Sequence, residues 1–107
     1  MRSTTASLNI SAMPAKSLNI LGLAMRARKL SYGETGVVDI KSGKACLVLL
    51  ANDASERTGK HIRNTCAYYH VPCLEEYSRE ELSASIGKGN VVMVAILDKG
   101  FASAFEK

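Results

Sequence analysis

The sequence predicts a single α/β domain, a three-layer α/β/α sandwich around a small mixed sheet. Two strand-sized apolar runs, residues 45–51 and 91–97, contain no charged residue, which is typical of strands buried on both faces. Segments with helical spacing of apolar residues alternate with these runs, and this alternation favours a layered α/β architecture. The 107 residues suit one domain, and 47% of them are hydrophobic, so one core can form.

Composition and charge narrow the classes of function. No apolar run is longer than a strand, so a helix that crosses a bilayer is not expected. Arg2 is not followed by an apolar segment, which argues against a secretory signal and favours a cytoplasmic location. The three cysteines show neither zinc-ligand spacing nor a Cys-x-x-Cys pattern, so we expect free thiols, with Cys46 and Cys66 buried, and neither a metal nor a cofactor. The net charge of +4 permits contact with phosphate groups.

The N-terminal part divides into an extension and a helix. Its first residues are rich in Ser, Thr and Asn without a period, so we expect residues 1–14 to be a flexible extension of a domain over residues 15–107. Leu18, Leu21 and Met25 then recur at helical spacing. The basic residues that follow Met25 end this helix, where cations interact favourably with the helix dipole.

Three pairs of residues at capping-box spacing predict the starts of further helices. The pairs are Ser31 with Glu34, Asp53 with Glu56, and Ser78 with Glu81. We expect the first of these helices to end near residues 42–43, the second to cover residues 55–70 and the third to run to residue 86. The buried stripe expected for the second helix consists of Thr58, Ile62, Cys66 and Tyr69.

The remaining segments predict short strands and a last helix. Residues 71–74 form a strand that Pro72 confines to an edge or to a strand start, because proline has no N–H group. A further short strand can form near residues 30–31. The Gly-Lys-Gly-Asn segment at residues 87–90 ends the third capped helix in a basic loop, and a turn leads into a last helix over residues 101–107.

No group of residues favours catalysis. His61 and His70 are the only histidines, and neither lies near a nucleophile in the sequence. Cys66 and His70 stand at helical spacing, but such a pair is more often a by-product of helix packing than a catalytic dyad. We therefore expect a protein that is not an enzyme.

Three features favour contact with a nucleic acid, and each has a purely structural alternative. Several cations suggest a basic face, although an ordinary solvated surface explains them equally well. The loop over residues 87–90 lacks the G-x-x-x-x-G-K-[ST] pattern of phosphate-binding loops, and its glycines either cap the helix or let the backbone approach a nucleic acid. The helix start at Glu34 offers N–H groups to phosphates or base edges, although Glu34 also completes a capping box.

Seven segments together carry a resemblance to a known family. They are residues 21–29 (LGLAMRARK), 33–34 (GE), 42–54 (SGKACLVLLANDA), 66–72 (CAYYHVP), 78–82 (SREEL), 86–88 (IGK) and 92–102 (VMVAILDKGFA). In their order and spacing the chain resembles the kink-turn-binding ribosomal proteins of the archaeal large-subunit protein seven-Ae family, and most of all their small bacterial members of the YlxQ type. The likeness covers nearly everything after residue 16.

The resemblance implies an α/β/α sandwich that binds structured RNA, such as ribosomal RNA or another kink-turn RNA, in or with the ribosome. The family reads sheared G·A pairs with a G-x-N-E-x-x-K motif at the start of its second helix, which falls here on Gly33 onward. It also packs the loop before its last long strand, here residues 86–91, against a protruding nucleotide. The RNA-binding residues implied are Arg28, Lys29, Gly33, Glu34, Thr35, Lys44, Ile86, Gly87, Lys88, Gly89 and Asn90.

The chain departs from the family motif, and this leaves two other functions open. Counted from Gly33, Thr35 stands at the Asn position, Gly36 at the Glu position and Asp39 at the Lys position. A protein-interaction module with a degenerate RNA site is one alternative. The other is a small-ligand-binding domain at the strand ends, where residues 52–53 follow a buried run.

Overall fold

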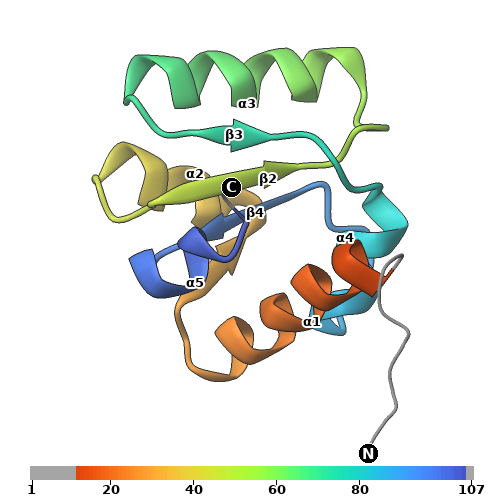
Figure 1. Cartoon of the computed structure of the whole chain (residues 1–107). Coiled ribbons are helices and arrows are strands. Elements are labelled where there is room, and N and C mark those ends of the chain that lie inside the picture. Colours follow the sequence, from red (N-terminus) through yellow and green to blue (C-terminus); the bar gives the residue numbers. More distant parts are fainter. Residues whose placement is uncertain (1–11, 106–107) are drawn as a thin grey trace, which may run out of the picture.

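The computed structural model describes residues 12–105 and has five helices and four strands within that part of the chain (Figure 1). In chain order they are α1 (Ala12–Arg26), β1 (Leu30–Tyr32), α2 (Gly33–Lys41), β2 (Leu47–Leu50), α3 (Glu56–Tyr68), β3 (Cys73–Leu74), α4 (Arg79–Ile86), β4 (Met93–Ile96) and α5 (Lys99–Ser103). A flexible extension was predicted over residues 1–14. Residues 1–11 lie outside the described residues, whereas residues 12–14 form the beginning of α1. Residues 106–107, the end of the predicted last helix, also lie outside them.

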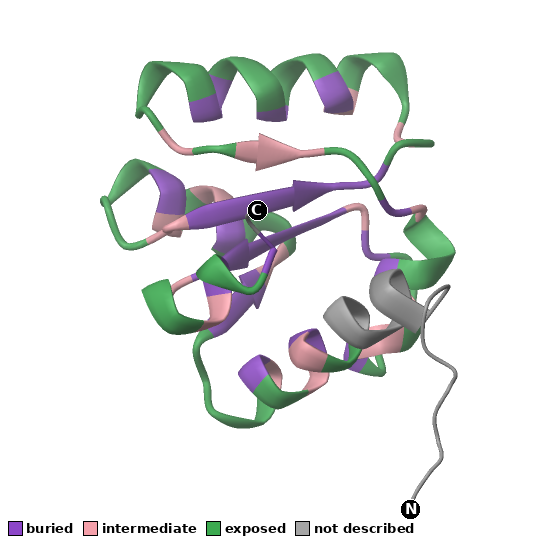
Figure 2. Ribbon diagram, in the orientation of Figure 1, coloured by how far each residue is buried: buried purple, intermediate pink, exposed green. Residues whose placement is uncertain are grey.

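The four strands form one mixed sheet in the order β1-β4-β2-β3. Strand β4 runs antiparallel to β1 and β2, whereas β2 and β3 run parallel. The inner strands β2 and β4 are buried along their whole length, which confirms the two strands predicted from the apolar runs (Figure 2). The short strand predicted near residues 30–31 is confirmed as β1, and β3 lies at an edge, as Pro72 indicated.

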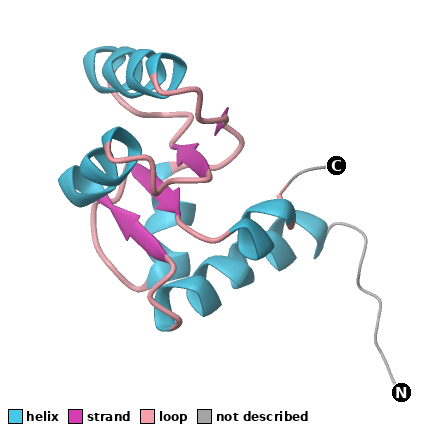
Figure 3. Ribbon diagram, turned by 90° about the vertical axis from the view of Figure 1, so that its left-hand side faces the viewer, coloured by secondary structure: helices cyan, strands magenta, loops and turns pink. Residues whose placement is uncertain are grey.

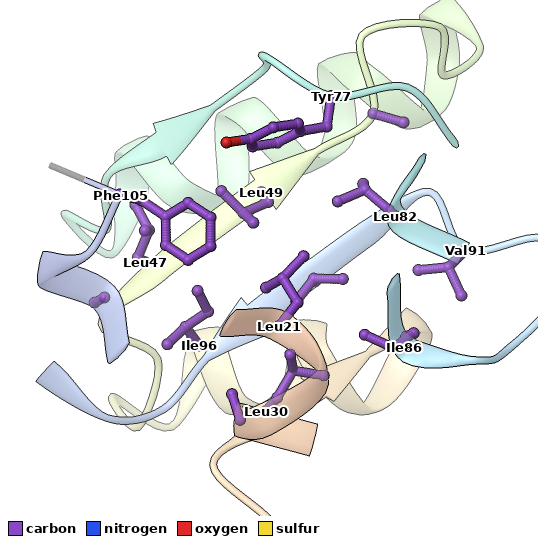
Figure 4. Close-up of a cluster of buried hydrophobic side chains, with 14 residues drawn as sticks. Leu21, Leu30, Leu47, Leu49, Tyr77, Leu82, Ile86, Val91, Ile96 and Phe105 are labelled. Atoms are coloured by element: carbon purple, nitrogen blue, oxygen red, sulfur yellow. The ribbon is translucent and has the colours of Figure 1, made fainter. Parts of the chain in front are cut away.

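Helices cover both faces of the sheet and confirm the three-layer sandwich (Figures 1 and 3). Alternate side chains of β2 point to opposite faces. Leu47 and Leu49 pack in one core with residues from α1, α4 and α5, which Figure 4 shows around Leu21. Val48 and Leu50 pack in the other core with residues from α2 and α3. Because both faces are covered, the turns that join strands to helices lie at the two ends of the strands.

The strand register defines these two ends. Tyr32, the last residue of β1, pairs with Val94, near the first residue of β4. Helix α2 begins beside them, so we call this end the α2-start end. At the opposite end of the sheet, Leu30 and Leu47 both pair with Ile96.

The capping box predicted at Ser78 and Glu81 is confirmed. The Ser78 hydroxyl accepts a hydrogen bond from the Glu81 N–H at 3.1 Å, and the Glu81 carboxylate accepts one from the Ser78 N–H at 2.8 Å. Helix α4 therefore starts where its local sequence predicts.

The capping box predicted at Asp53 and Glu56 is wrong. Ser55 caps α3 instead, with its hydroxyl accepting the Thr58 N–H at 3.2 Å. The Asp53 carboxylate accepts the N–H of Arg79, the first residue of α4, at 2.8 Å. A helix start leaves its first N–H groups without partners inside the helix, so Asp53 serves α4 rather than α3.

The predicted buried stripe of α3 is wrong in part. Ile62 and Cys66 are buried, but Thr58 is half-buried and Tyr69 is exposed. The buried face consists of Gly59, Ile62, Thr65 and Cys66. The buried face therefore keeps the predicted direction, with Gly59 and Thr65 in place of Thr58 and of Tyr69, which lies at the C-cap.

The capping box predicted at Ser31 and Glu34 is also wrong. Ser31 lies in β1 opposite Ala95, and its hydroxyl is buried without a hydrogen-bond partner among the described residues. Tyr32 occupies the N-cap position of α2 in an extended conformation. Pairing of β1 with β4 has therefore overridden the local signal. The predicted end of the helix near residues 42–43 is confirmed, with Ser42 at the C-cap and Gly43 at φ +82°.

Candidate functional site

The start of α2 presents uncapped backbone N–H groups to solvent. The Tyr32 side chain makes no capping hydrogen bond to this helix within the described part of the chain. Gly33, Glu34 and Thr35 follow it and are exposed. Gly33 has φ +65°, a conformation that glycine adopts without strain, and a Cβ atom there would meet nothing within 4 Å. Unpartnered N–H groups at a helix start favour negatively charged or electron-rich ligand atoms.

A shallow hollow of about 510 Å³ opens beside this helix start. Its walls come from α2, from the first turns of α3 and from the beginning of β4. The lining residues are Gly33, Glu34, Val37, Val38, Thr58, His61, Ile62, Val92 and Met93. Most of the lining is aliphatic, and its titratable residues are Glu34 and His61. The hollow suits a flat, partly apolar group with polar edges.

The loop between α4 and β4 borders the same end of the sheet. Gly87 ends α4 with φ +71°, and the Ser83 side chain accepts the N–H of Val91 at 2.8 Å. The carbonyl of Val92 accepts the N–H of Ala51 at 2.8 Å, which fixes the loop exit beside the end of β2. The exposed part of the loop, residues 87–90, therefore stands on a fixed base next to the hollow.

Ile86 differs from the other loop residues that the resemblance implied. Its side chain is only 7% exposed and belongs to the core formed with α1 and α4. It supports the loop from below, and it does not offer surface to a ligand.

The predicted site residues divide between the two ends of the sheet. Gly33, Glu34, Thr35 and the loop over residues 87–90 lie at the α2-start end. Lys29 and Lys44 lie at the opposite end, since the Lys29 carbonyl accepts the Leu97 N–H at 2.8 Å and the Lys44 N–H donates to the carbonyl of Asp39 near the end of α2. Arg28 adjoins Lys29 there. The structure therefore does not bring Lys88 together with Arg28, Lys29 and Lys44 on one basic face.

The departure at Gly36 has a steric cause. Gly36 is buried, and a Cβ atom there would lie 2.8 Å from Sδ of Met93 in β4. Position 36 faces the sheet, so it cannot present a carboxylate to a ligand whatever residue stands there. Glu34 is the exposed acid of the first turn. Asp39 is half-buried toward the other end of the helix, where its carbonyl accepts the N–H groups of Lys44 and Ala45.

Sequence reasoning missed the apolar part of the hollow. The sequence patterns assign neither Val37 nor His61 to a site. Val38 lines the hollow and is 60% exposed. No local pattern links these residues to Val92, because only the packing of α2 against α3 and β4 brings them together.

The thiols and histidines do not form a catalytic group. Cys66 is only 2% exposed and hydrogen-bonds through its thiol with Cys73 of β3, which together with burial raises the pKa of Cys66. It therefore stays protonated and inaccessible. His70 is exposed and ends α3 with φ +59°. Within residues 12–105, no group of three or more His, Cys, Asp or Glu side chains is arranged to hold a metal ion. The helices of this described part are also too short or too polar to cross a membrane.

Comparison with known proteins gives several matches along most of the chain. The sequence profile of the ribosomal protein L7Ae/L30e/S12e/Gadd45 family matches residues 15–106. The RNA-binding protein YlxQ of Enterococcus faecium is 48% identical over 88 residues, which cover 81% of this chain and 84% of that protein. The RNA-binding protein YlxQ of Bacillus subtilis is 48% identical over 85 residues, which cover 78% and 85%.

Solved structures share the architecture. A protein of unknown function from Bacillus halodurans superposes with a TM-score of 0.79 at 36% identity, covering 87% of this chain and 99% of that one. The Giardia lamblia 15.5kD RNA binding protein has a TM-score of 0.74 at 17% identity, covering 97% of this chain and 90% of that one, and so shares the fold.

Proposed function

We propose that this chain, which belongs to the ribosomal protein L7Ae/L30e/S12e/Gadd45 family, binds structured RNA at its α2-start end and catalyses no reaction. Relatives that are 48% identical are named as RNA-binding proteins. One observation carries the proposal: an uncapped helix start, a fixed glycine loop and an apolar hollow meet at one end of the sheet.

The helix start supplies polar contacts that need no positive side chain. The first N–H groups of α2, those of Glu34 and Thr35, have no capping side chain and donate to phosphate oxygens or to acceptors on base edges. Glu34 accepts from base amino groups, and the Thr35 hydroxyl both donates and accepts. Contacts of this kind specify a site, whereas phosphate contacts position the protein along the RNA. Lys88 supplies such a phosphate contact from the loop.

The hollow supplies a place for an unstacked base. RNA is recognised with sequence or shape specificity mainly where bases are splayed out of a helix. Val37, Val38 and Val92 give an apolar surface for one face of a base, and Glu34 and His61 stand at its polar edge. A kink-turn presents such a nucleotide beside sheared G·A pairs, so we propose a kink-turn RNA, in ribosomal RNA or another transcript, as the ligand. The domain that binds it covers residues 15–107.

A binding titration with two RNAs tests this function. One RNA carries a kink-turn, and the other is a fully paired duplex of equal length and charge. We expect the kink-turn RNA to bind at least about tenfold more tightly at physiological salt, since shape-specific contacts add to the shared phosphate term. Thr35→Ala should reduce that preference, because it removes a polar group of the helix start and leaves the charge unchanged.

Two charge variants separate specificity from general attraction. Lys88→Gln should weaken the binding of both RNAs. It should also lower the slope of log affinity against log salt concentration by about one unit, as expected for one lost phosphate contact. Lys60→Gln on the exposed face of α3 is the matched control and should leave the slope nearly unchanged. Equal and weak binding of both RNAs by the natural sequence would contradict kink-turn recognition and favour a protein-interaction module.

A further inference from the structure

The opposite end of the sheet carries a concentration of cations that the proposed RNA site does not use. They come from the α1–β1 turn, the α2–β2 turn and the start of α5. We call them the opposite-end cations: Arg26, Arg28, Lys29, Lys41, Lys44 and Lys99. All of these residues are exposed, and none forms an ion pair with another residue in the described part of the chain.

Backbone hydrogen bonds bring the three turns side by side. The end of β4 lies between the beginnings of β1 and β2, with Leu97 N–H donating to the Lys29 carbonyl at 2.8 Å and Cys46 N–H donating to the Ile96 carbonyl at 2.7 Å. Lys44 stands two positions before Cys46, and Lys99 stands two positions after Leu97. Figure 3 looks onto this end of the molecule, with the turns toward the viewer. The cations therefore share one surface although they are far apart in sequence.

The acids of the described chain are distributed in the reverse way. Most lie at the α2-start end, around the starts of α2, α3 and α4 and after β3: Glu34, Asp53, Glu56, Glu75, Glu76, Glu80 and Glu81. At the opposite end, Asp39 is half-buried, and the Asp98 carboxylate accepts the N–H of Phe101 at 3.1 Å as the cap of α5. The molecule is thus polarised along its strands, and the modest net charge conceals a strongly positive end.

One of these cations occupies a position where its side chain strains the backbone. Arg28 follows α1 with φ +61°, in the left-handed conformation that glycine usually supplies at a helix C-terminus. The turn is closed by hydrogen bonds from the N–H of Arg28 to the carbonyl of Met25 at 3.1 Å and from that of Lys29 to Ala24 at 2.9 Å. Glycine would relieve the strain, so the arginine is not explained by the turn itself.

We propose that the opposite-end cations form a second RNA surface, which holds the phosphate backbone of a paired segment apart from the RNA at the start of α2. Exposed arginines and lysines on adjacent turns match the regular negative charge of a duplex. A protein partner usually requires an apolar anchor, whereas the exposed residues of these three turns are Arg, Lys, Ser, Gly and Ala, and the exposed aromatic residues of this end, Tyr68 and Tyr69, lie at the end of α3. One molecule can then bridge two RNA segments. This inference rests on the proposed function only in taking RNA as the ligand.

The test uses a charge-removing variant that suits the backbone. The full chain carries Arg28→Gly, Lys29→Gln and Lys44→Gln, and glycine fits the φ of +61° at position 28. The control removes equal charge elsewhere, with Arg57→Gln, Lys60→Gln and Arg79→Gln. Thermal melts establish that both proteins fold.

The first readout is the affinity for a blunt RNA duplex without bulges, measured against salt. The opposite-end variant should bind at least about tenfold more weakly at low salt and lose about two to three units of salt slope, whereas the control should lose less than one. The preference of the opposite-end variant for a minimal kink-turn RNA over that duplex should not fall below that of the natural sequence. Equal losses in the two variants would overturn the proposal, because only total charge would then matter.

The second readout is bridging. A kink-turn RNA is fixed to a surface, and the protein is bound to it. The bound protein should capture a separate labelled duplex, and the opposite-end variant should not. Displacement of the duplex by a glutamate oligomer of equal charge at the same concentration would assign the surface to an acidic protein and overturn the proposal. If the natural sequence binds kink-turn and duplex RNA equally well, only the proposed kink-turn function is contradicted. Duplex binding by the opposite-end cations is measured independently with the two charge variants.

Discussion

Gly36 determines which face of α2 packs on the sheet and which face is exposed to solvent. Its backbone approaches the Met93 side chain so closely that a Cβ atom would lie 2.8 Å from the sulfur. The side chains at positions 34, 35 and 38 consequently face solvent, while Ile40 faces the core. The first turn therefore has Glu34 and Thr35 as its accessible polar side chains.

A glutamate at position 36 should damage the fold and leave the family motif unrestored. Gly36→Glu places an unpaired carboxylate against Met93, and we expect a loss of at least about 3 kcal/mol in the free energy of unfolding. Val38→Glu on the same helix is the matched control and should change it by less than about 0.5 kcal/mol, since Val38 is 60% exposed. Urea denaturation measures both. A stable Gly36→Glu protein with tighter kink-turn binding would show that position 36 faces the ligand.

Ser31 and Ser78 both stand three residues before a glutamate, but their hydroxyl groups have different roles. Ser78→Ala should lower the free energy of unfolding by about 1 kcal/mol, because it removes a capping hydrogen bond. Ser31→Ala should be neutral or stabilising by up to about 1 kcal/mol, because it removes a buried hydroxyl that lacks a partner among the described residues. Denaturant melts of the two variants check the pair. A loss at Ser31 as large as that at Ser78 would contradict the strand assignment.

At the scale of elements, α3 and β3 are joined by the thiols of Cys66 and Cys73. The hydrogen bond from the Cys66 thiol lowers the pKa of Cys73, and Arg63 adds to this, while burial and Glu75 oppose it. The same hydrogen bond and burial raise the pKa of Cys66. Cys73, in the edge strand, is therefore the more acidic and more reactive thiol of the two.

The pH dependence of alkylation tests this link. In a Cys46→Ala protein, iodoacetamide should modify Cys73 with a rate that rises at a pH below the ordinary thiol pKa of about 8.5, because the thiolate reacts. Adding Cys66→Ala removes the donor and should move the rate profile to higher pH. Mass spectrometry follows the modified residue. An unchanged profile would mean that the two thiols do not interact.

The strands and most helices follow from local pattern, whereas two of the three predicted capping boxes do not form. The apolar runs that contain β2 and β4 are long and uninterrupted, so their burial is readable from the sequence. The Asp53 carboxylate accepts the N–H of Arg79, which is 26 positions away, and Ser31 lies in a strand that pairs with β4. Such partners are set by the tertiary fold, which a window of a few residues does not contain.

At the scale of the whole molecule, the sheet order separates two surfaces. The resemblance to RNA-binding proteins predicted the helix start and the glycine loop, and the structure brings these two elements to the same end. The resemblance did not indicate that Arg28, Lys29 and Lys44 lie at the other end of the sheet from the helix start and the loop. That separation depends on β4 lying between β1 and β2, a consequence of strand order that spacing in the sequence does not reveal.

The most direct test of the proposed RNA site is a titration of the isotope-labelled chain with kink-turn RNA, followed through its backbone amide signals. The largest shifts should fall on residues 33–35 and 87–92, because their N–H groups lie at the helix start and in the loop. Lys60 and its neighbours on the exposed face of α3 should change little. Shifts confined to Arg28, Lys29, Lys44 and Lys99, with the signals of residues 33–35 unmoved, would contradict RNA recognition by the start of α2.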